Sequence, residues 1–322
     1  MVYDRPWKSF EEQLAILEGR GMDIGDKAQA LSYLERIGYY RLSAYWYPFR
    51  KFEFEQDPDT GRIKPITKDE FHAGTHFLDA VNLYLFDKKL RLMVIDALER
   101  IEVAIRVDIA YLLGERNTFA YKDQSEFHPK FSNKKIKGIP VFEAWHEKYT
   151  GLVSRSKEDF VKHYRNKHGD DLPIWVAVEV WDFGAMSQLF SMMKVPDQQK
   201  ISQKYGISDF KVFSSWLRSL NYLRNLVAHH SRLWNRNIID QPKLPKKGEI
   251  DWCDEFIGKN DLISKPFLLF AIIRQLISSI CPNAEWHLRL KQHLENFPEL
   301  CSSKKRTIED MGTTDAWKDW WI

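Results

Sequence analysis

Arginine, asparagine and histidine come close together in residues 224–229, which read RNLVAH and give the pattern R-N-x-x-x-H. Asn225 and His229 are four residues apart, so on a helix they share a face and the amide can orient the imidazole. Arg224 and His229 are five apart, about 140° around an ideal helix, so they do not share a face. Histidine exchanges protons near neutral pH, and the planar charged fork of arginine suits phosphate. These residue types indicate metal-independent cutting of RNA, with the 2′-hydroxyl as the nucleophile.

An amphipathic helix within residues 208–236 is expected to position this motif. Ser208 is the predicted N-cap, and Asp209 lies in the first turn, where the helix dipole favours an anion. Steps of three and four draw one apolar and one polar stripe along the helix. The apolar stripe is Trp216, Leu220, Leu223 and Val227, and the polar stripe is Arg218, Asn221, Asn225 and His229.

The longer run LRNLVAHHSRLWNR resembles the signature of the abortive-infection AbiD/AbiF-like family. That family is a branch of the HEPN superfamily, whose R-x4-6-H motif marks many ribonucleases. The second histidine and the residues trailing it, Arg232 to Asn235, make this far more specific than R-x4-H alone. IGYYRLSAYWYPFR, FDKKLRLMVIDALERIEVAIR and the pair Trp175 and Glu179 also resemble the family. The end, MGTTDAWKDWWI, is similar too, but has Thr-Thr where an apolar residue and a proline are expected.

The resemblance implies a mainly α-helical, HEPN-type bundle with helical extensions at both ends. It implies a homodimer in which two R-x4-H motifs meet in one composite cleft, and a role in phage defence as an abortive-infection or toxin-like ribonuclease. Cleavage would leave a 2′,3′-cyclic phosphate and a 5′-hydroxyl. In this hypothesis His229 is the general acid or base, Arg224 stabilises the phosphorane, and Asn225 positions the imidazole. His230 and Arg232 are second-rank candidates.

Other interpretations of the same residues stay open. The chain is alternatively a non-catalytic RNA-binding or dimerisation module, or a toxin held inactive by a small RNA or an antitoxin. Arg224 and His229 alternatively form a network that only ties down the end of the helix. Glu102 is a candidate partner for Arg224, or forms a surface salt bridge with Arg106, four residues along its helix.

Composition bounds the possible partners and the compartment. The 322 residues carry a net charge of only +3, so any argument for RNA binding must rest on local patches. Cys253, Cys281 and Cys301 lie far apart and suggest neither a zinc site nor disulfides. The N-terminal residues lack a signal-peptide pattern, and no apolar segment reaches the roughly 20 residues of a membrane helix. We expect a soluble, cytoplasmic protein without a metal, a cofactor or a membrane partner.

The whole chain is predicted to be a single Abi/HEPN-like domain. Its expected parts are an N-terminal helical and aromatic region (1–78), a HEPN core (79–240) and C-terminal helices with a Trp-rich tail (241–322). Within the core, a long helix is predicted over 79–113 from a nearly continuous apolar seam ending at Gly114.

Two regions are candidates for RNA contact. A basic insertion near 129–168 has ten Lys or Arg against four acids, and we take Lys134, Lys135 and Lys137 as its RNA-binding residues. The aromatic run 39–50 is either a stacking surface for bases, flanked by Arg41 and Arg50, or a lid on the core.

The remaining segments give local expectations. Ser9 and Glu12 predict a capping box, and residues 51–78 predict a hairpin or a loop. In 173–193 the apolar positions Trp175, Val178, Trp181 and Met186 are expected in the core, and Glu179 is expected to be buried with a partner. Helices are predicted over 266–280 and 285–296, and the C-terminal tryptophans are expected to dock onto the domain or a partner chain.

Overall fold

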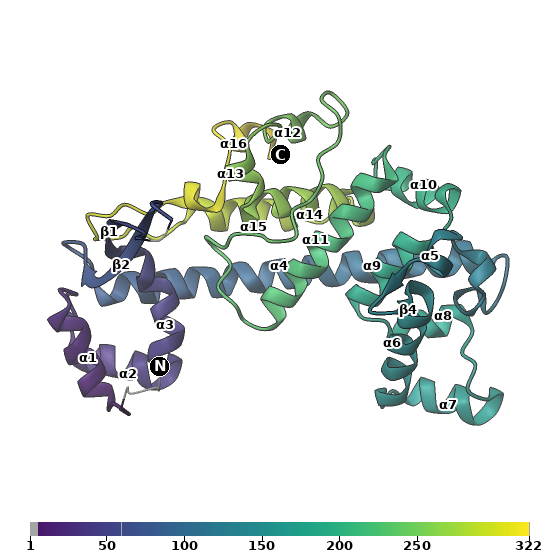
Figure 1. Ribbon diagram of the computed structural model, residues 1–322, viewed down its shortest axis with the longest axis horizontal. Coiled ribbons are helices and arrows are strands. Elements are labelled where there is room, and N and C mark those ends of the chain that lie inside the picture. Colours follow the sequence, from purple (N-terminus) through teal and green to yellow (C-terminus); the bar gives the residue numbers. More distant parts are fainter. Residues whose placement is uncertain (1–5, 59, 322) are drawn as a thin grey trace. The chain divides into compact units, whose positions relative to one another are not determined.

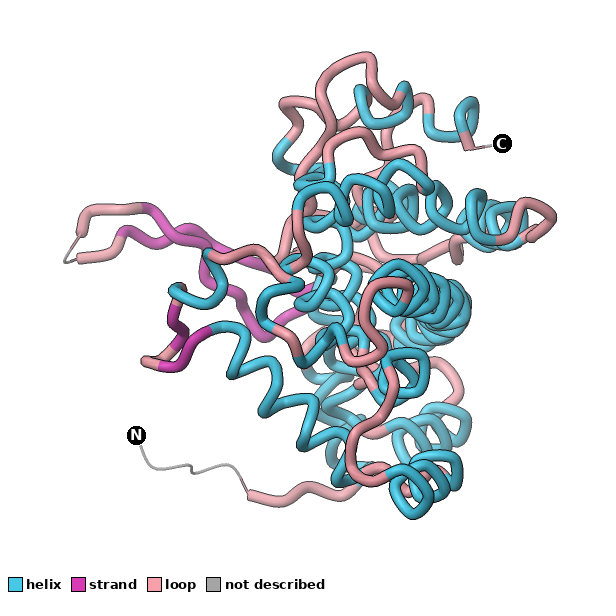
Figure 2. The backbone as a smooth tube through the Cα atoms, turned by 90° about the vertical axis from the view of Figure 1, so that its right-hand side faces the viewer, coloured by secondary structure: helices cyan, strands magenta, loops and turns pink. Residues whose placement is uncertain are grey.

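A computed structural model of the chain is mainly α-helical (Figure 1). It describes residues 6–58 and 60–321. The strands of the described residues form two small antiparallel hairpins, drawn in magenta in Figure 2. The predicted mainly α fold class is therefore confirmed, whereas its assignment to the HEPN type stays a prediction.

The chain groups into two compact units, each with its own core. Unit 1 contains the residues up to Arg91, then Arg232–Trp234 and Leu290–Asp310. Unit 2 contains Leu92–Ser231, Asn235–Arg289 and the residues from Met311 onward. The prediction of one Abi/HEPN-like domain, with the three parts given above, stays a prediction.

Unit 1 begins with short helices that lead into a hairpin. Its elements are α1 (Phe10–Gly19), α2 (Lys27–Ile37), α3 (Tyr39–Trp46), the 3-10 helix η1 (Tyr47–Phe49), β1 (Arg50–Gln56), β2 (Ile63–Phe71), the first part of α4 (Phe77–Gly114), the last part of α15 (Trp286–Glu295) and most of η5 (Ile308–Met311). The predicted capping box is confirmed, because the Ser9 hydroxyl accepts from the N–H of Glu12 while the Glu12 carboxylate accepts from the N–H of Ser9.

The aromatic run 39–50 divides between the two roles considered for it. Tyr45, Trp46 and Phe49 are buried and form part of the core of unit 1. Tyr40 and Tyr47, by contrast, are exposed on the same segment. The core-lid interpretation is thus confirmed for the buried rings alone. Residues 51–78 contain the hairpin of β1 and β2, in which Glu55 pairs with Lys64.

A buried carboxylate on α4 organises unit 1. Asp87 accepts a hydrogen bond of 2.7 Å from the Tyr45 hydroxyl and also pairs with Arg91, one helical turn along. Its oxygens further accept from the backbone N–H groups of Leu233 and Trp234, at 3.1 and 2.8 Å. A fully buried acid therefore holds the backbone of Leu233 and Trp234, a few residues after the motif.

Unit 2 holds most of the helices, among them the motif helix. Its elements are the rest of α4, η2 (Ala120–Lys122), η3 (Gln124–Glu126), α5 (Lys130–Asn133), β3 (Lys135–Ile136), β4 (Ile139–Pro140), α6 (Val141–Arg155), α7 (Asp159–His168), α8 (Ile174–Ala177), η4 (Val178–Val180), α9 (Phe183–Met192), α10 (Val195–Lys204), α11 (Phe210–Ala228), α12 (Asp251–Asp254), α13 (Asn260–Ile263), α14 (Pro266–Ile280), the start of α15, and α16 (Trp317–Trp320). The long helix α4 extends the predicted 79–113 by two residues at the start and by Gly114 at the end.

The motif helix α11 packs against α9, α10 and α14 (Figure 1). Its predicted apolar stripe is confirmed, because Trp216, Leu220, Leu223 and Val227 are all buried. The N-cap is Asp209 rather than the predicted Ser208, and its side chain accepts from the N–H of Lys211 at 2.8 Å.

Two predictions for residues 173–193 are wrong. Trp175 is 52% exposed rather than part of the core. Glu179 is also exposed, on the short 3-10 helix η4, rather than buried with a partner. The segment divides into α8, η4 and α9, so positions three or four apart along it do not all face the same way. Val178, Trp181 and Met186 are buried as predicted.

The C-terminal tryptophans dock onto unit 2, as expected. Trp317 and Trp321 are buried, and both rings contact Phe267 at the start of α14, with ring centroids 5.5 and 5.3 Å away. The indole N–H of Trp321 also donates to the carbonyl of His287 at 2.9 Å. The predicted helices over 266–280 and 285–296 are confirmed as α14 and α15.

Candidate functional site

The R-N-x-x-x-H motif occupies the last turn of α11 and its C-cap. Asn225 is exposed on the final turn, and His229 is exposed as the C-cap residue. Within the described residues no side-chain hydrogen bond joins the Asn225 amide to the His229 ring, so the predicted orientation of the imidazole by the amide stays a prediction. Both side chains are accessible to a ligand.

The helix ends in a Schellman motif whose left-handed position is a histidine. The N–H of Ser231 donates to the carbonyl of Leu226 at 2.9 Å, and the N–H of His230 donates to that of Val227 at 3.1 Å. His230 lies between them with a φ of 55°, where glycine is the usual residue. A side chain with a Cβ is strained there by roughly 1 kcal/mol. Backbone strain of this kind concentrates at functional sites.

Arg224 lies on a different side of the helix and is half-buried. Two carboxylates of unit 2 are near it, Glu102 on α4 and Asp182 at the start of α9, because the positive charge of Arg224 acts on the pKa of each. Arg224 is half-buried, whereas His229 is exposed at the end of the helix, so the two side chains have different surroundings. That they act from different chains stays a prediction from their spacing.

Glu102 is a buried acid, not part of the surface salt bridge that the sequence suggested. Its predicted partner Arg106 is confirmed, and the Arg106 guanidinium also donates to the backbone carbonyl of Trp181. Burial raises the pKa of Glu102, and the charges of Arg106 and Arg224 offset part of that rise. The i,i+4 pair is largely removed from water, because the side chains of Arg106 and Glu102 are only 14% and 11% exposed.

Asp182 caps α9 and meets a lysine from α6. Its carboxylate accepts from the N–H of Ala185 at 2.6 Å and from Lys148 Nζ at 2.7 Å. Burial alone would raise the pKa of Asp182, but these hydrogen bonds and the charges of Lys148 and Arg224 bring it below its ordinary value. Asp182 is therefore held as a carboxylate beside the motif helix.

Gly184 allows these groups to approach α9 closely. A Cβ at Gly184 would lie 3.1 Å from Lys148 Nζ and 3.3 Å from both Asn221 Oδ1 and Asp182 Oδ1. Asn221, from the polar stripe of α11, thus lies near Lys148 and Asp182. Sequence reasoning missed Asp182 and Lys148 as members of the site, although Asp182 before a helical segment is a recognisable capping signal.

We use the name Arg224 cluster for Glu102, Arg106, Lys148, Asp182 and Arg224. Three cations and two carboxylates leave the cluster with one net positive charge. The two acids are already paired with Arg106 and Lys148, so neither is committed to neutralising Arg224. An arginine held in place but not neutralised suits a phosphate group.

The second-rank candidate Arg232 has a different setting from His230. It belongs to unit 1, where its guanidinium donates to the carbonyl of Ala44. This bond to α3 favours a structural role for Arg232, next to the backbone that Asp87 holds.

The residues predicted to bind RNA are all exposed. Lys134, Lys135 and Lys137 lie at and between the two short strands β3 and β4, and Arg41 lies on α3. The aromatic residues interleaved with the lysines do not share this exposure. Phe131 and Trp145 are buried in the core of unit 2, which removes them as stacking partners for bases.

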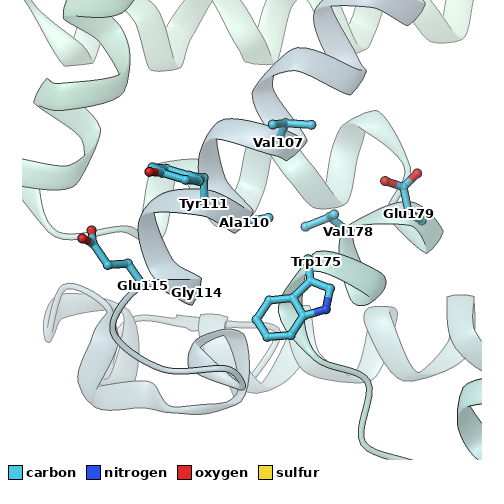
Figure 3. Close-up of a pocket in the computed structure, with 8 residues that line it drawn as sticks. All are labelled: Val107, Ala110, Tyr111, Gly114, Glu115, Trp175, Val178 and Glu179. Atoms are coloured by element: carbon cyan, nitrogen blue, oxygen red, sulfur yellow. The ribbon is translucent and has the colours of Figure 1, made fainter.

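An apolar cavity of about 480 Å³ in unit 2 lies along the exposed side of α4 (Figure 3). Val107 and Tyr111 of α4 line it on one side, and Trp175 and Val178 line it on the other. Tyr111 is 79% exposed and Val107 is 54% exposed. An exposed aromatic and aliphatic face of this kind is typical of an interaction surface.

Two features are absent from the described residues. No helix among residues 6–58 and 60–321 combines the length and low polarity that crossing a membrane requires. The same part of the chain contains no cluster of three or more His, Cys, Asp or Glu side chains arranged to hold a metal ion.

Comparison with known proteins identifies the family. The sequence pattern of the family described as "Abi-like protein" matches residues 32–235, which is more than half of the chain. The match extends from α2 to the residue that follows Trp234, and so includes the whole R-N-x-x-x-H motif. Neither the curated proteins nor the solved structures gave a match. The chain belongs to the family of Abi-like proteins.

Proposed function

We propose that this protein is a metal-independent endoribonuclease of a phage-defence system. Membership of the Abi-like family points to abortive-infection phage defence. The observation that carries the enzymatic part is the division of the motif: Arg224 is held beside paired carboxylates, while Asn225 and His229 are exposed at the end of the same helix. HEPN-type architecture is part of this proposal.

The reaction is transfer of a phosphodiester to its own ribose. The 2′-oxygen of RNA bonds to the adjacent phosphorus, the bond to the 5′-oxygen of the next nucleotide breaks, and the products are a 2′,3′-cyclic phosphate and a 5′-hydroxyl. One group takes the proton of the 2′-hydroxyl, and another gives a proton to the leaving 5′-oxygen. His229 fills one of these roles, with His230 as a second candidate, and Arg224 stabilises the charge on the phosphorane.

A second copy of the chain completes this site. Arg224 and His229 are five residues apart, about 140° around an ideal helix, which favours contact with one phosphate from two different chains. We propose a homodimer in which the apolar face of Val107, Tyr111 and Trp175 on each chain is covered by the other. That face belongs to the same unit as the motif and includes part of α4, the helix that carries Glu102.

The exposed lysines of the β3 and β4 hairpin supply an electrostatic contact for RNA. Neutralising Lys134, Lys135 and Lys137 together should weaken RNA binding and make the affinity less dependent on salt concentration. With fewer phosphate contacts, binding releases fewer counterions from the RNA. Equal affinity and an equal salt slope in the triple variant would remove the hairpin from the proposal.

Incubation of the purified protein with RNA in EDTA tests the enzymatic proposal. Metal-independent cleavage should occur in the wild type and be lost in His229→Ala and Arg224→Ala, with circular dichroism unchanged. The control is Arg218→Ala, which removes an exposed arginine from the same helix outside the motif. Equal cleavage by the wild type and both motif variants would contradict the proposal, and binding without any cleavage would favour the non-catalytic RNA-binding module.

A further inference from the structure

Unit 1 contains a groove of about 700 Å³ that the proposed cleavage does not use. The segment before α1 contributes Trp7 and Lys8, and α1 contributes Gln13 and its C-cap Arg20. Tyr40 at the start of α3 and Asp69 on β2 complete the residues discussed below. The volume lies within the range of ordinary small-molecule sites.

Two aromatic rings line the groove without serving the core. Trp7 is 85% exposed and Tyr40 is 76% exposed, although rings of this size are mostly buried in folded proteins. The core beneath α3 is already filled by Tyr45 and Trp46 from the same helix. The exposed rings are therefore available to stack on a flat ligand, as aromatic side chains stack on nucleic-acid bases.

The charges of the groove select against a cationic ligand. Asp69 is its acid, and it is already paired with Arg20 at 2.7 Å and with Arg50 at 3.3 Å. Lys8 lines the groove as well and has only a long contact of 3.7 Å with Glu12. An aromatic cage for a quaternary ammonium would need the opposite balance. A ligand with a flat ring and a negative group fits both the exposed rings and the charges of the groove.

We infer that this groove binds a nucleotide, with its base stacked on Trp7 and Tyr40. The phosphate lies toward Lys8 and Arg20, where the positive charge is. A free nucleotide and an unpaired nucleotide of an RNA strand present the same chemistry to the groove. The inference goes beyond the proposed cleavage, because it concerns binding by unit 1 and needs no reaction.

Binding measurements on the full chain test the groove. The His229→Ala background is used so that RNA probes stay intact, and calorimetry compares adenosine monophosphate, ribose 5-phosphate and a single-stranded oligoadenylate. Adenosine monophosphate or the oligoadenylate should bind. Ribose 5-phosphate lacks the base, so its affinity should be lower by a factor of at least about ten. Trp7→Ala and Tyr40→Ala should each weaken binding about tenfold, which corresponds to one lost stacking contact.

The matched control is Phe54→Ala, which removes another strongly exposed aromatic ring of unit 1 that does not line the groove. Binding should be unchanged in this variant. Preference for the mononucleotide identifies a free nucleotide as the ligand, and preference for the oligonucleotide identifies an RNA residue. Equal binding by Trp7→Ala, Tyr40→Ala and their parent overturns the inference, as does the absence of binding by either base-containing probe. Because no cleavage is measured, failure of the ribonuclease proposal leaves this result unaffected.

Discussion

Asp182 combines two roles beside the motif helix, as the N-cap of α9 and as the partner of Lys148. Asp182→Ala should lower the free energy of unfolding by about 1 kcal/mol, the usual effect of losing an N-cap. Asp182→Asn keeps a capping oxygen and should lose less. Urea denaturation at neutral pH measures the difference. If the two variants are equally stable, the cap contributes nothing and the interaction with Lys148 carries the effect.

The depressed pKa of Asp182 also makes a prediction about pH. The folded state favours the ionised form of Asp182 more strongly than the unfolded chain does. This contribution to the free energy of unfolding is present at pH values above the ordinary pKa of 3.8, and it is lost as the pH falls through the lower pKa of the folded state. Asp182→Asn has no proton to take up at this position. The stability of the wild type should therefore approach that of the variant on acidification from pH 7 to pH 3, as measured by denaturant titration.

His230 occupies a backbone position that favours glycine, with a φ of 55°. His230→Gly should therefore raise the free energy of unfolding by up to about 1 kcal/mol through relief of strain. His229 has a φ of −88°, so His229→Gly relieves nothing and should lower stability instead. Thermal denaturation of both variants is the measurement. A His230→Gly protein that is no more stable than the wild type would show that the backbone at this position is not strained.

The residue types of the motif were sufficient to indicate its chemistry, but not its surroundings. The four-residue step correctly placed Asn225 and His229 together on the exposed side of α11. Lys148 and Asp182 come from other helices, and their place near Arg224 depends on how α6 packs on α9 and how α9 packs on α11. Helical periodicity describes one helix at a time, so a cluster assembled from four helices lies outside what it can predict.

At the scale of the element, α4 offers two ion pairs of the same spacing and opposite burial. Asp87 and Arg91 are almost fully buried, whereas Asp96 and Arg100 are about 40% exposed. Asp87→Ala should cost about 3–5 kcal/mol, because it leaves a buried arginine uncompensated and also removes the acceptor of two backbone N–H groups. Asp96→Ala should cost less than about 1 kcal/mol.

Chemical denaturation of the two variants side by side provides the measurement. Where Asp87→Ala is too unstable to purify, Asp87→Asn retains an acceptor and should be intermediate between Asp87→Ala and the wild type. Similar stabilities for the Asp87 and Asp96 variants would show that burial of the first pair has no energetic consequence.

The apolar pattern of residues 79–113 predicts the length and the apolar side of α4, but the burial expected for its polar residues is partly wrong. Its repeated leucines and isoleucines predict a helix over 79–113, and α4 is Phe77–Gly114. Glu102 was expected at a surface because acids usually are, yet it is buried. The reverse error occurred at Trp175, where a large apolar residue was expected inside and is exposed. In both cases the packing of other segments, rather than local composition, decides burial.

At the scale of the whole molecule, the arginine and the histidine that contact one phosphate come either from one chain or from two. On an ideal helix Arg224 and His229 of one chain face different ways, which favours a site shared by two chains.

The exposed face of α4 gives the proposed contact, and Val107→Lys should disrupt it by placing a charge in an apolar interface. Ile239→Lys is the control, since Ile239 is also aliphatic and is more exposed than Val107 (78% against 54%) but does not line that face. Light scattering should show a monomer for Val107→Lys alone, with loss of RNA cleavage.

Mixing two inactive variants tests the shared site directly. A dimer of one Arg224→Ala chain and one His229→Ala chain retains one arginine and one histidine on opposite chains. In a composite site these two meet at the same phosphate, so half of the sites in each mixed dimer are intact. With random reassortment half of the dimers are mixed, and about a quarter of the wild-type cleavage should return. If both residues act from the same chain, no mixture restores activity. Adding Val107→Lys to both variants should abolish the recovery, because the chains then no longer pair.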